Sequence, residues 1–245
     1  MAFQFVHVST YSVKTGGAGI AAEAGRKPDN SRHIENPKPP VLLAGVQPEI
    51  AWAEVERRHG AARDNITLKS GKPAERKMRR DENVLLAAVA SYPTPTEQLN
   101  PDDETFLDWK QRTLDFFKEV HGEPLTAILH LDETHPHIHF LTAPDLEAGQ
   151  RMKDIHPGFQ AKAELGGRNA KAIAKNHAWK AAMREYQDNY HESVSQHFAH
   201  LRLGPRRQRL STPEYKAQQA EAERIQKRLK ALDFAETQQR SEFHQ

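Results

Sequence analysis

Hydrophobic residues gather in short runs that polar and proline-rich segments separate. Three of these runs have the length of buried strands, at residues 83–92 (NVLLAAVASY), 125–131 (LTAILHL) and 137–142 (HIHFLT). A shorter apolar stretch at residues 3–8 adds a strand at the start of the chain. Because only a short turn separates the second and third runs, the pattern predicts that these two strands form a hairpin.

Helical periodicity marks three other segments. Residues 50–63 predict a short helix. A second helix begins at Asp102 or Asp103, which caps it, and runs to Val120 with its aromatic residues on one face. A long polar helix is predicted at residues 168–199. The aromatic face indicates that the second helix packs on the sheet.

Two segments have the composition of loops. Residues 16–19 are glycine-rich, which predicts a flexible stretch. Residues 28–40 (PDNSRHIENPKPP) are studded with proline and cannot form a regular helix or a central strand. A loop of this length inside a compact domain is usually functional or disordered.

Strands that alternate with helices, with at least one hairpin, predict an α+β domain. Its sheet is mainly antiparallel and its helices pack on one face of that sheet, with long C-terminal helices after it. We expect this domain at residues 1–210. Residues 211–245 predict a charged helix, which begins near Thr212 and Pro213 and serves as a linker or as the start of a further region.

Composition narrows the classes of function. The 245 residues include no cysteine, which excludes disulfides, thiolate metal sites and cysteine nucleophiles. The first residues lack the basic start and long apolar run of a signal peptide, and no stretch approaches the roughly 18 apolar residues of a membrane span. We therefore expect a cytoplasmic protein. The net charge of +2 provides no strong overall attraction to nucleic acid.

The segment HLDETHPHIH carries most of the candidate chemistry. Side chains alternate along a strand, so His137 and His139 point the same way, and a tight turn brings His130 beside them. Three neutral nitrogen ligands leave coordination positions open, as in catalytic metal sites. Asp132 and Glu133 are close enough to orient the ligands or to act as a base.

Basic residues form two clusters that suit contacts with phosphates. The first holds Arg76, Lys77, Arg79 and Arg80, and the second holds Arg202, Arg206, Arg207 and Arg209. Since the first cluster precedes a predicted core strand, we expect it at one edge of the sheet.

The histidine segment resembles the HxDExxPHxH motif of plasmid mobilisation relaxases of the Mob/Pre (MobV) type, a branch of the HUH endonucleases. RRDENVLLAAVASYP and FFKEVHGE are similar to segments that the family places upstream of the motif. The resemblance spans roughly residues 1–210. It implies a DNA nickase and strand transferase that cuts one strand at a plasmid transfer origin, joins covalently to the 5′ end and releases a 3′-hydroxyl.

By the same motif, the metal ligands are His130, His137 and His139, with Glu133 and Asp132 as the acid/base or orienting pair. The cofactor implied is a divalent metal, Mn²⁺ or Mg²⁺, with Zn²⁺ as the alternative. The partners implied are transfer-origin DNA, as a hairpin with a single strand, and a conjugative coupling protein.

The attacking group is less directly indicated. In the best-known branch of the family it is a histidine three residues before an arginine; Arg26 matches that arginine, but the matching position holds Glu23. His33, in the proline-framed loop, is the preferred candidate because a neutral imidazole is a competent nucleophile. Glu23 and Tyr11 are the other candidates.

Two further functions fit parts of this pattern. One is a module that binds origin DNA without nicking it, since the expected histidine is replaced at Glu23. The other is a zinc-dependent hydrolase, which shares the three-histidine ligand set but does not account for the basic clusters.

Overall fold

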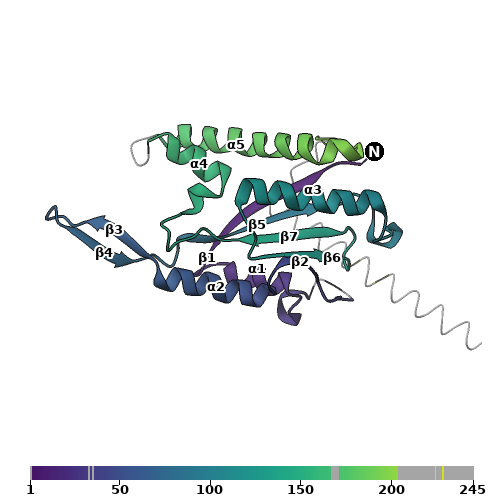
Figure 1. Ribbon diagram of the computed structural model, residues 1–245, viewed down its shortest axis with the longest axis horizontal. Coiled ribbons are helices and arrows are strands. Elements are labelled where there is room, and N and C mark those ends of the chain that lie inside the picture. Colours follow the sequence, from purple (N-terminus) through teal and green to yellow (C-terminus); the bar gives the residue numbers. More distant parts are fainter. Residues whose placement is uncertain are drawn as a thin grey trace, which may run out of the picture. The chain divides into compact units, whose positions relative to one another are not determined.

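A computed structural model describes residues 2–32, 34, 36–166, 171–203, 224 and 228 of the chain. A five-stranded antiparallel sheet lies at its centre, with the strand order β1-β5-β7-β6-β2 (Figure 1). In that order the strands are β1 (Phe5–Ser12), β5 (Asn83–Ser91), β7 (His137–Thr142), β6 (Thr126–His130) and β2 (Val41–Gly45). The predicted α+β fold with a mainly antiparallel sheet is confirmed.

Helices cover both faces of this sheet, not the single face that the sequence suggested (Figure 1). The helices on one face are α3 (Glu104–His121), α4 (Pro157–Glu164) and α5 (Ala172–Ser193). Those on the other face are α1 (Gly17–Ala24) and α2 (Pro48–Ala61). Short 3-10 turns complete the chain at Pro28–Asn30, Thr96–Gln98, Met152–Asp154 and Ser195–Phe198. Each face of the sheet therefore has its own hydrophobic core.

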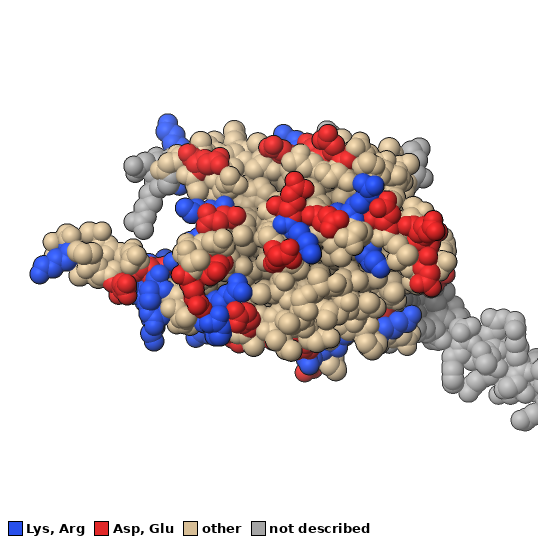
Figure 2. Space-filling view, in the orientation of Figure 1, with Lys and Arg blue, Asp and Glu red and all other residues tan. Residues whose placement is uncertain are grey.

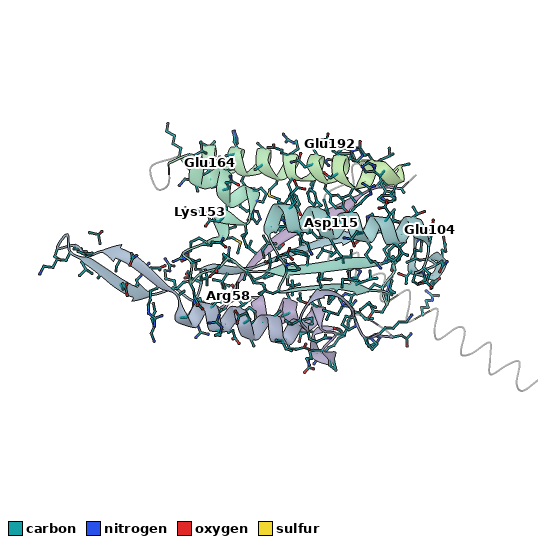
Figure 3. All side chains as sticks on the ribbon, in the orientation of Figure 1. Arg58, Glu104, Asp115, Lys153, Glu164 and Glu192 are labelled. Carbon is teal, nitrogen blue, oxygen red and sulfur yellow. The ribbon has the colours of Figure 1, made fainter. Side chains whose placement is uncertain are left out.

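Helix α3 forms where its amphipathic pattern predicts. The Asp103 side chain accepts hydrogen bonds from the backbone N–H groups of Thr105 and Phe106, which caps the helix. Charged residues such as Glu104 and Asp115 lie on its exposed side (Figure 3). The buried side contributes Phe106, Trp109, Thr113, Leu114, Phe116, Phe117 and His121.

The predicted hairpin is formed by β6 and β7. Every residue of both strands is buried, because β5 and β2 flank them and helices cover both faces. His130, the last residue of β6, lies directly opposite His137, the first residue of β7. The sheet register thus fixes the relative position of these two histidines.

The expectation of a flexible segment at residues 16–19 is wrong. Gly16 has a positive φ of 80° and precedes α1, which begins at Gly17. A Cβ at Gly17 would lie 2.4 Å from the ring of Trp52, so close packing against α2 explains the glycine.

Two other elements were not predicted. One is β2. The other is a separate two-stranded ribbon, β3 (Arg63–Thr67) and β4 (Pro73–Lys77), which projects from the body (Figure 1).

The polar helix predicted at residues 168–199 is shorter and has a separate helix before it. Helix α5 ends at Ser193 and packs on α4, while Tyr186 and Tyr190 reach into the core. Most of residues 204–245, including the predicted terminal helix and the boundary at residue 210, lie outside the described residues. Within the described part of the chain, no helix is both long enough and apolar enough to cross a membrane.

Candidate metal centre

Three histidines converge at the end of the β6–β7 hairpin. One nitrogen of each ring of His130, His137 and His139 lies within 4.8 Å of the corresponding atoms of the other two. Their ring centroids are 4.9 to 5.0 Å apart, and all three side chains are buried. The strand alternation and the tight turn therefore produce the convergence that the sequence predicted.

Backbone carbonyls determine which nitrogen atoms are free. Nε2 of His130 lies 2.9 Å from the carbonyl oxygen of Ala24, and Nδ1 of His137 lies 3.0 Å from that of His135. A carbonyl only accepts, so these two ring nitrogens carry the protons. Nδ1 of His130 and Nε2 of His137 then face each other with lone pairs at 3.1 Å. Such lone pairs repel each other unless a cation lies between them, and a metal ion meets that need.

Burial keeps the imidazoles of His130 and His139 neutral. It lowers the pKa of His130 to about 3, with help from the positive charge of Arg26. Burial also lowers the pKa of His139 well below its usual value, and Nδ1 of that ring has no hydrogen-bond partner among the described residues. Neutral, converging imidazoles are the form of histidine that binds a metal.

An ion-pair network fixes the turn between β6 and β7, the two strands that carry the histidines. The Arg26 guanidinium donates to both carboxylate oxygens of Asp132, at 2.6 and 2.8 Å, and to Oε1 of Glu133 at 2.9 Å. The Lys38 backbone N–H also donates to Asp132 at 3.0 Å. Burial alone would raise the pKa of Asp132, but these hydrogen bonds hold it below its usual value.

The two acids have different surroundings. The Asp132 side chain is fully buried, whereas that of Glu133 is 34% exposed. Oε1 of Glu133 also lies 3.5 Å from Nε2 of His137. Asp132 is thus a fixed structural partner of Arg26, and Glu133 is the carboxylate that solvent and a substrate can reach.

A cavity of about 300 Å³ opens beside the histidines. Its lining residues are Glu23, Val89, Ser91, Glu133, Thr134, His135, His137 and His139. Glu23, in the last turn of α1, therefore belongs to the same cavity as two of the predicted ligands. Glu133 lines the same cavity, and Arg26 joins Glu133 to Asp132.

The remaining candidates for the attacking group lie elsewhere or cannot be placed. Tyr11, on β1, packs against the core beneath Gly16 and is not among the described residues that line the cavity. His33 lies outside the described residues. The proline-framed segment around it contains no regular strand or α-helix in its described part, as predicted.

The first basic cluster lies away from this centre. Arg76 and Lys77 are exposed on the ribbon, not at an edge of the main sheet as predicted, and Arg79 and Arg80 are exposed in the segment that follows it. Figure 2 shows Lys and Arg side chains on the projecting ribbon and at its base. The ribbon joins the start of β5, while the end of that strand, at Ser91, pairs with His137. A strand of this length separates the two ends by roughly 26 Å.

The second basic cluster is described only at its first residue. Arg202 pairs with Asp188, with Nε and Oδ1 2.6 Å apart. Arg206, Arg207 and Arg209 lie outside the described residues.

Sequence reasoning missed the main-chain groups of the site. The carbonyls of Ala24 and His135 and the N–H of Lys38 complete the hydrogen bonding of the histidines and of Asp132. Main-chain groups are present at every residue, so no sequence pattern marks them.

The fold is that of a relaxase domain. It is similar to two crystal structures of the "MobM Relaxase Domain (MOBV; Mob_Pre)", both Mn-bound and both bound to plasmid pMV158 oriT DNA. The complex with 23-nucleotide DNA at pH 6.5 has a TM-score of 0.52 and 17% identity, covering 89% of this chain and 99% of that one. The complex with 22-nucleotide DNA at pH 5.5 has a TM-score of 0.50 and 16% identity, covering 88% and 99%.

The sequence itself identifies the family. A model of the Mob_Pre family, described as "Plasmid recombination enzyme", matches residues 64–217. The chain belongs to this family, which confirms the resemblance seen in its histidine motif. No curated protein matches the chain.

Proposed function

We propose that this protein is a metal-dependent relaxase that initiates conjugative mobilisation of a plasmid. It nicks one strand at a transfer origin, stays covalently joined to the 5′-phosphate and releases a 3′-hydroxyl. The observation that carries the proposal is the convergence of three imidazoles, two of which line a cavity together with Glu133, the partner of Arg26. The similar MobM domain binds Mn and origin DNA, which supports both the cofactor and the substrate.

The three histidines fit a divalent metal because their ligand atoms converge and because free ring nitrogens of His130 and His137 face each other. His130, His137 and His139 would hold it, with Mn²⁺ or Mg²⁺ as the ion proposed and Zn²⁺ as the alternative. When bound, the metal supplies positive charge that polarises the scissile phosphate and stabilises its transition state.

The other residues position and exchange protons. Arg26 orients the carboxylates of Asp132 and Glu133, so the turn between the ligand strands keeps one conformation. Glu133 lies at the cavity wall and is partly exposed, so it can exchange a proton with the leaving oxygen or with water. The side chain that attacks the phosphorus forms a covalent intermediate, which conserves the energy of the phosphodiester for rejoining.

The basic clusters are proposed to hold the DNA away from the reacting phosphate. Arg76, Lys77, Arg79 and Arg80 are exposed and suited to the backbone of an origin hairpin. The second cluster, from Arg202 to Arg209, is proposed to contact the same DNA. A cytoplasmic location, a conjugative coupling protein as partner, and a relaxase domain at residues 1–210 followed by a linker helix at residues 211–245 belong to the same proposal.

The test uses the purified full chain with Mn²⁺ and labelled single-stranded oligonucleotides that tile both strands of the DNA beside its gene. One oligonucleotide should yield a shortened 5′-labelled product, and its 3′-labelled form should yield a protein adduct. His139→Ala should abolish both, whereas His177→Ala, a change at an exposed helix histidine, should leave both intact.

Failure to nick any of these DNAs with Mn²⁺, Mg²⁺ or Zn²⁺ would reject the proposal. Tight binding of one oligonucleotide without a nick would select the origin-binding module, and metal-dependent hydrolysis of small esters without DNA binding would select a zinc hydrolase.

A further inference from the structure

We propose that the carboxylate of Glu23 is the group that attacks the scissile phosphorus, so that the covalent intermediate is an acyl phosphate. This inference rests on the proposed function and deepens it. It assigns the reaction a chemistry that differs from attack by a histidine or a tyrosine.

Glu23 lies at the wall of the histidine cavity. Glu23 lines the same cavity as His137 and His139, yet it is not one of the three residues whose ligand atoms lie within 4.8 Å of one another. Glu23 therefore lines the cavity beside these histidines without belonging to their set. A phosphate bound in this cavity would be in the space that Glu23 lines.

The backbone holds Glu23 in this position. The carbonyl of the next residue, Ala24, accepts the hydrogen bond from Nε2 of His130. The Glu23 carbonyl accepts from the backbone N–H of Arg26 at 2.9 Å. The end of α1 is thus held to His130 and to Arg26, which binds Asp132 and Glu133. These contacts keep Glu23 close to the histidines.

Among the acids of this cavity and its turn, Glu23 differs in its hydrogen bonding. The acids of the turn, Asp132 and Glu133, are both bound to Arg26. The half-buried side chain of Glu23 has no hydrogen bond or ion pair among the described residues. A carboxylate free of such partners keeps its lone pairs for attack.

The step balances without a further reactant. One carboxylate oxygen of Glu23 forms a bond to phosphorus while the bond from phosphorus to O3′ breaks. The electron pair leaves with O3′, which takes a proton from Glu133 or from solvent and becomes the free 3′-hydroxyl. The 5′-phosphate is then joined to Glu23 as a mixed anhydride, and attack by a 3′-hydroxyl reverses the step. Carboxylates serve as nucleophiles of this kind in phosphoryl-transferring ATPases.

The experiment maps the adduct of the wild-type chain. The 3′-labelled adduct from the nicking assay is treated with neutral hydroxylamine, which cleaves an acyl phosphate and leaves a hydroxamate on the attacking side chain. A histidine phosphoramidate is instead labile to acid, and a tyrosine phosphodiester survives both treatments. Trypsin then releases residues 15–26, in which Glu23 is the only acidic side chain and no histidine or tyrosine occurs.

We expect hydroxylamine to release the DNA and the hydroxamate to appear in residues 15–26. Glu23→Gln should reduce nicking at least about 1000-fold, as removal of a nucleophile does elsewhere, while Mn²⁺ still stabilises the protein. Glu56→Gln, a change at an exposed glutamate of α2, is the matched control and should nick as the wild type does.

A hydroxylamine-resistant adduct, or one mapped to residues 33–57, which begin with His33, would overturn the inference and leave the proposed function intact. Nicking by Glu23→Gln at the wild-type rate would overturn it as well. A wild-type chain that forms no adduct at all would instead reject the proposed function, and this inference with it.

Discussion

The guanidinium of Arg26 grips the buried carboxylate of Asp132 from a position 106 residues earlier in the chain, through hydrogen bonds of 2.6 and 2.8 Å. Both side chains are almost completely excluded from solvent. Arg26 also adopts a left-handed backbone conformation, with φ at 56°. The pair links the end of α1 to the turn between β6 and β7. A substitution that removes the Arg26–Asp132 pair should therefore disturb both the end of α1 and this turn.

Replacement of Arg26 by alanine should destabilise the protein by about 3–5 kcal/mol, because a buried carboxylate is left without its partner. Arg26→Gly should be more stable than Arg26→Ala by about 1 kcal/mol, since glycine accepts a positive φ without steric cost. Urea denaturation of the two variants measures both differences.

Arg112→Ala, at an exposed arginine that pairs with Asp108 on α3, is the control and should cost less than about 1 kcal/mol. A loss of stability in Arg26→Ala no larger than in this control would show that the buried pair does not stabilise the fold. An Arg26→Ala variant more stable than Arg26→Gly would contradict the effect of the positive φ.

Metal binding should show itself as stabilisation of the folded chain. Mn²⁺ at 100 times its dissociation constant should add about 2.7 kcal/mol to the stability of the wild type. His130→Ala removes one of three ligands and should weaken Mn²⁺ binding at least about 100-fold, beyond the effect of losing an outer hydrogen bond. Thermal unfolding with and without Mn²⁺ and with a chelator provides the measurement.

His177→Ala should keep the full Mn²⁺ effect, since that residue is exposed on α5. An equal Mn²⁺ response in wild type and His130→Ala would show that the ion binds elsewhere.

The free energy of unfolding should decrease at acidic pH because buried His121 must take up a proton. Burial lowers the pKa of this residue to about 4, although its bond to the Ile155 carbonyl opposes the shift. The unfolded chain takes up a proton near pH 6.5, whereas the folded chain does so only near pH 4. The stability contribution is therefore complete above pH 6.5 and is lost as the pH falls toward 4, by about 3 kcal/mol in total.

His121→Asn keeps a donor for the Ile155 carbonyl and does not titrate in this range. The difference in unfolding free energy between wild type and variant should shrink as the pH is lowered from 7 to 4. A difference that stayed constant with pH would rule out His121 as the source.

The ribbon should contribute DNA affinity without contributing to the chemistry. Replacement of Arg76 and Lys77 by serine removes two exposed positive charges at roughly 26 Å from the histidines, by the length of β5. Binding of origin DNA should weaken, and the slope of log affinity against log salt should decrease by about 1.5. The nicking rate at saturating DNA should not change.

Lys110→Ser with Lys180→Ser removes the same charge from a partly exposed position on α3 and an exposed position on α5, and it should leave the slope unaltered. Equal salt slopes in the two double variants would argue against DNA contact at the ribbon.

The histidine cluster was predictable because its determinants are local. His130, His137 and His139 lie within ten residues, and strand alternation with a tight turn is enough to bring them together. Helix α3 was equally predictable, because its capping residue and its aromatic face lie within one continuous segment of the sequence. Long, regular patterns of this kind leave few other structures open.

The elements that the sequence did not predict depend on tertiary packing. Helix α1 opens on glycines that predict a loop. The ring of Trp52, 35 residues later, and the Ser12 carbonyl leave no room for a side chain at Gly17. The β3–β4 ribbon is polar and mostly exposed, so it lacks the apolar alternation by which strands are recognised. The close approach of Arg26 to Asp132 follows from no spacing in the sequence.

Strands β6 and β7 supply all three histidines from the interior of the sheet, whereas Glu23 enters from a helix outside it. The histidines and the attacking side chain can therefore change independently during evolution. A substitution at position 23 leaves β6, β7 and their hydrogen bonds in place. A lineage could thus replace the attacking group and keep its metal-binding histidines. The architecture would thus allow a family to diversify its covalent chemistry by single substitutions on a constant scaffold.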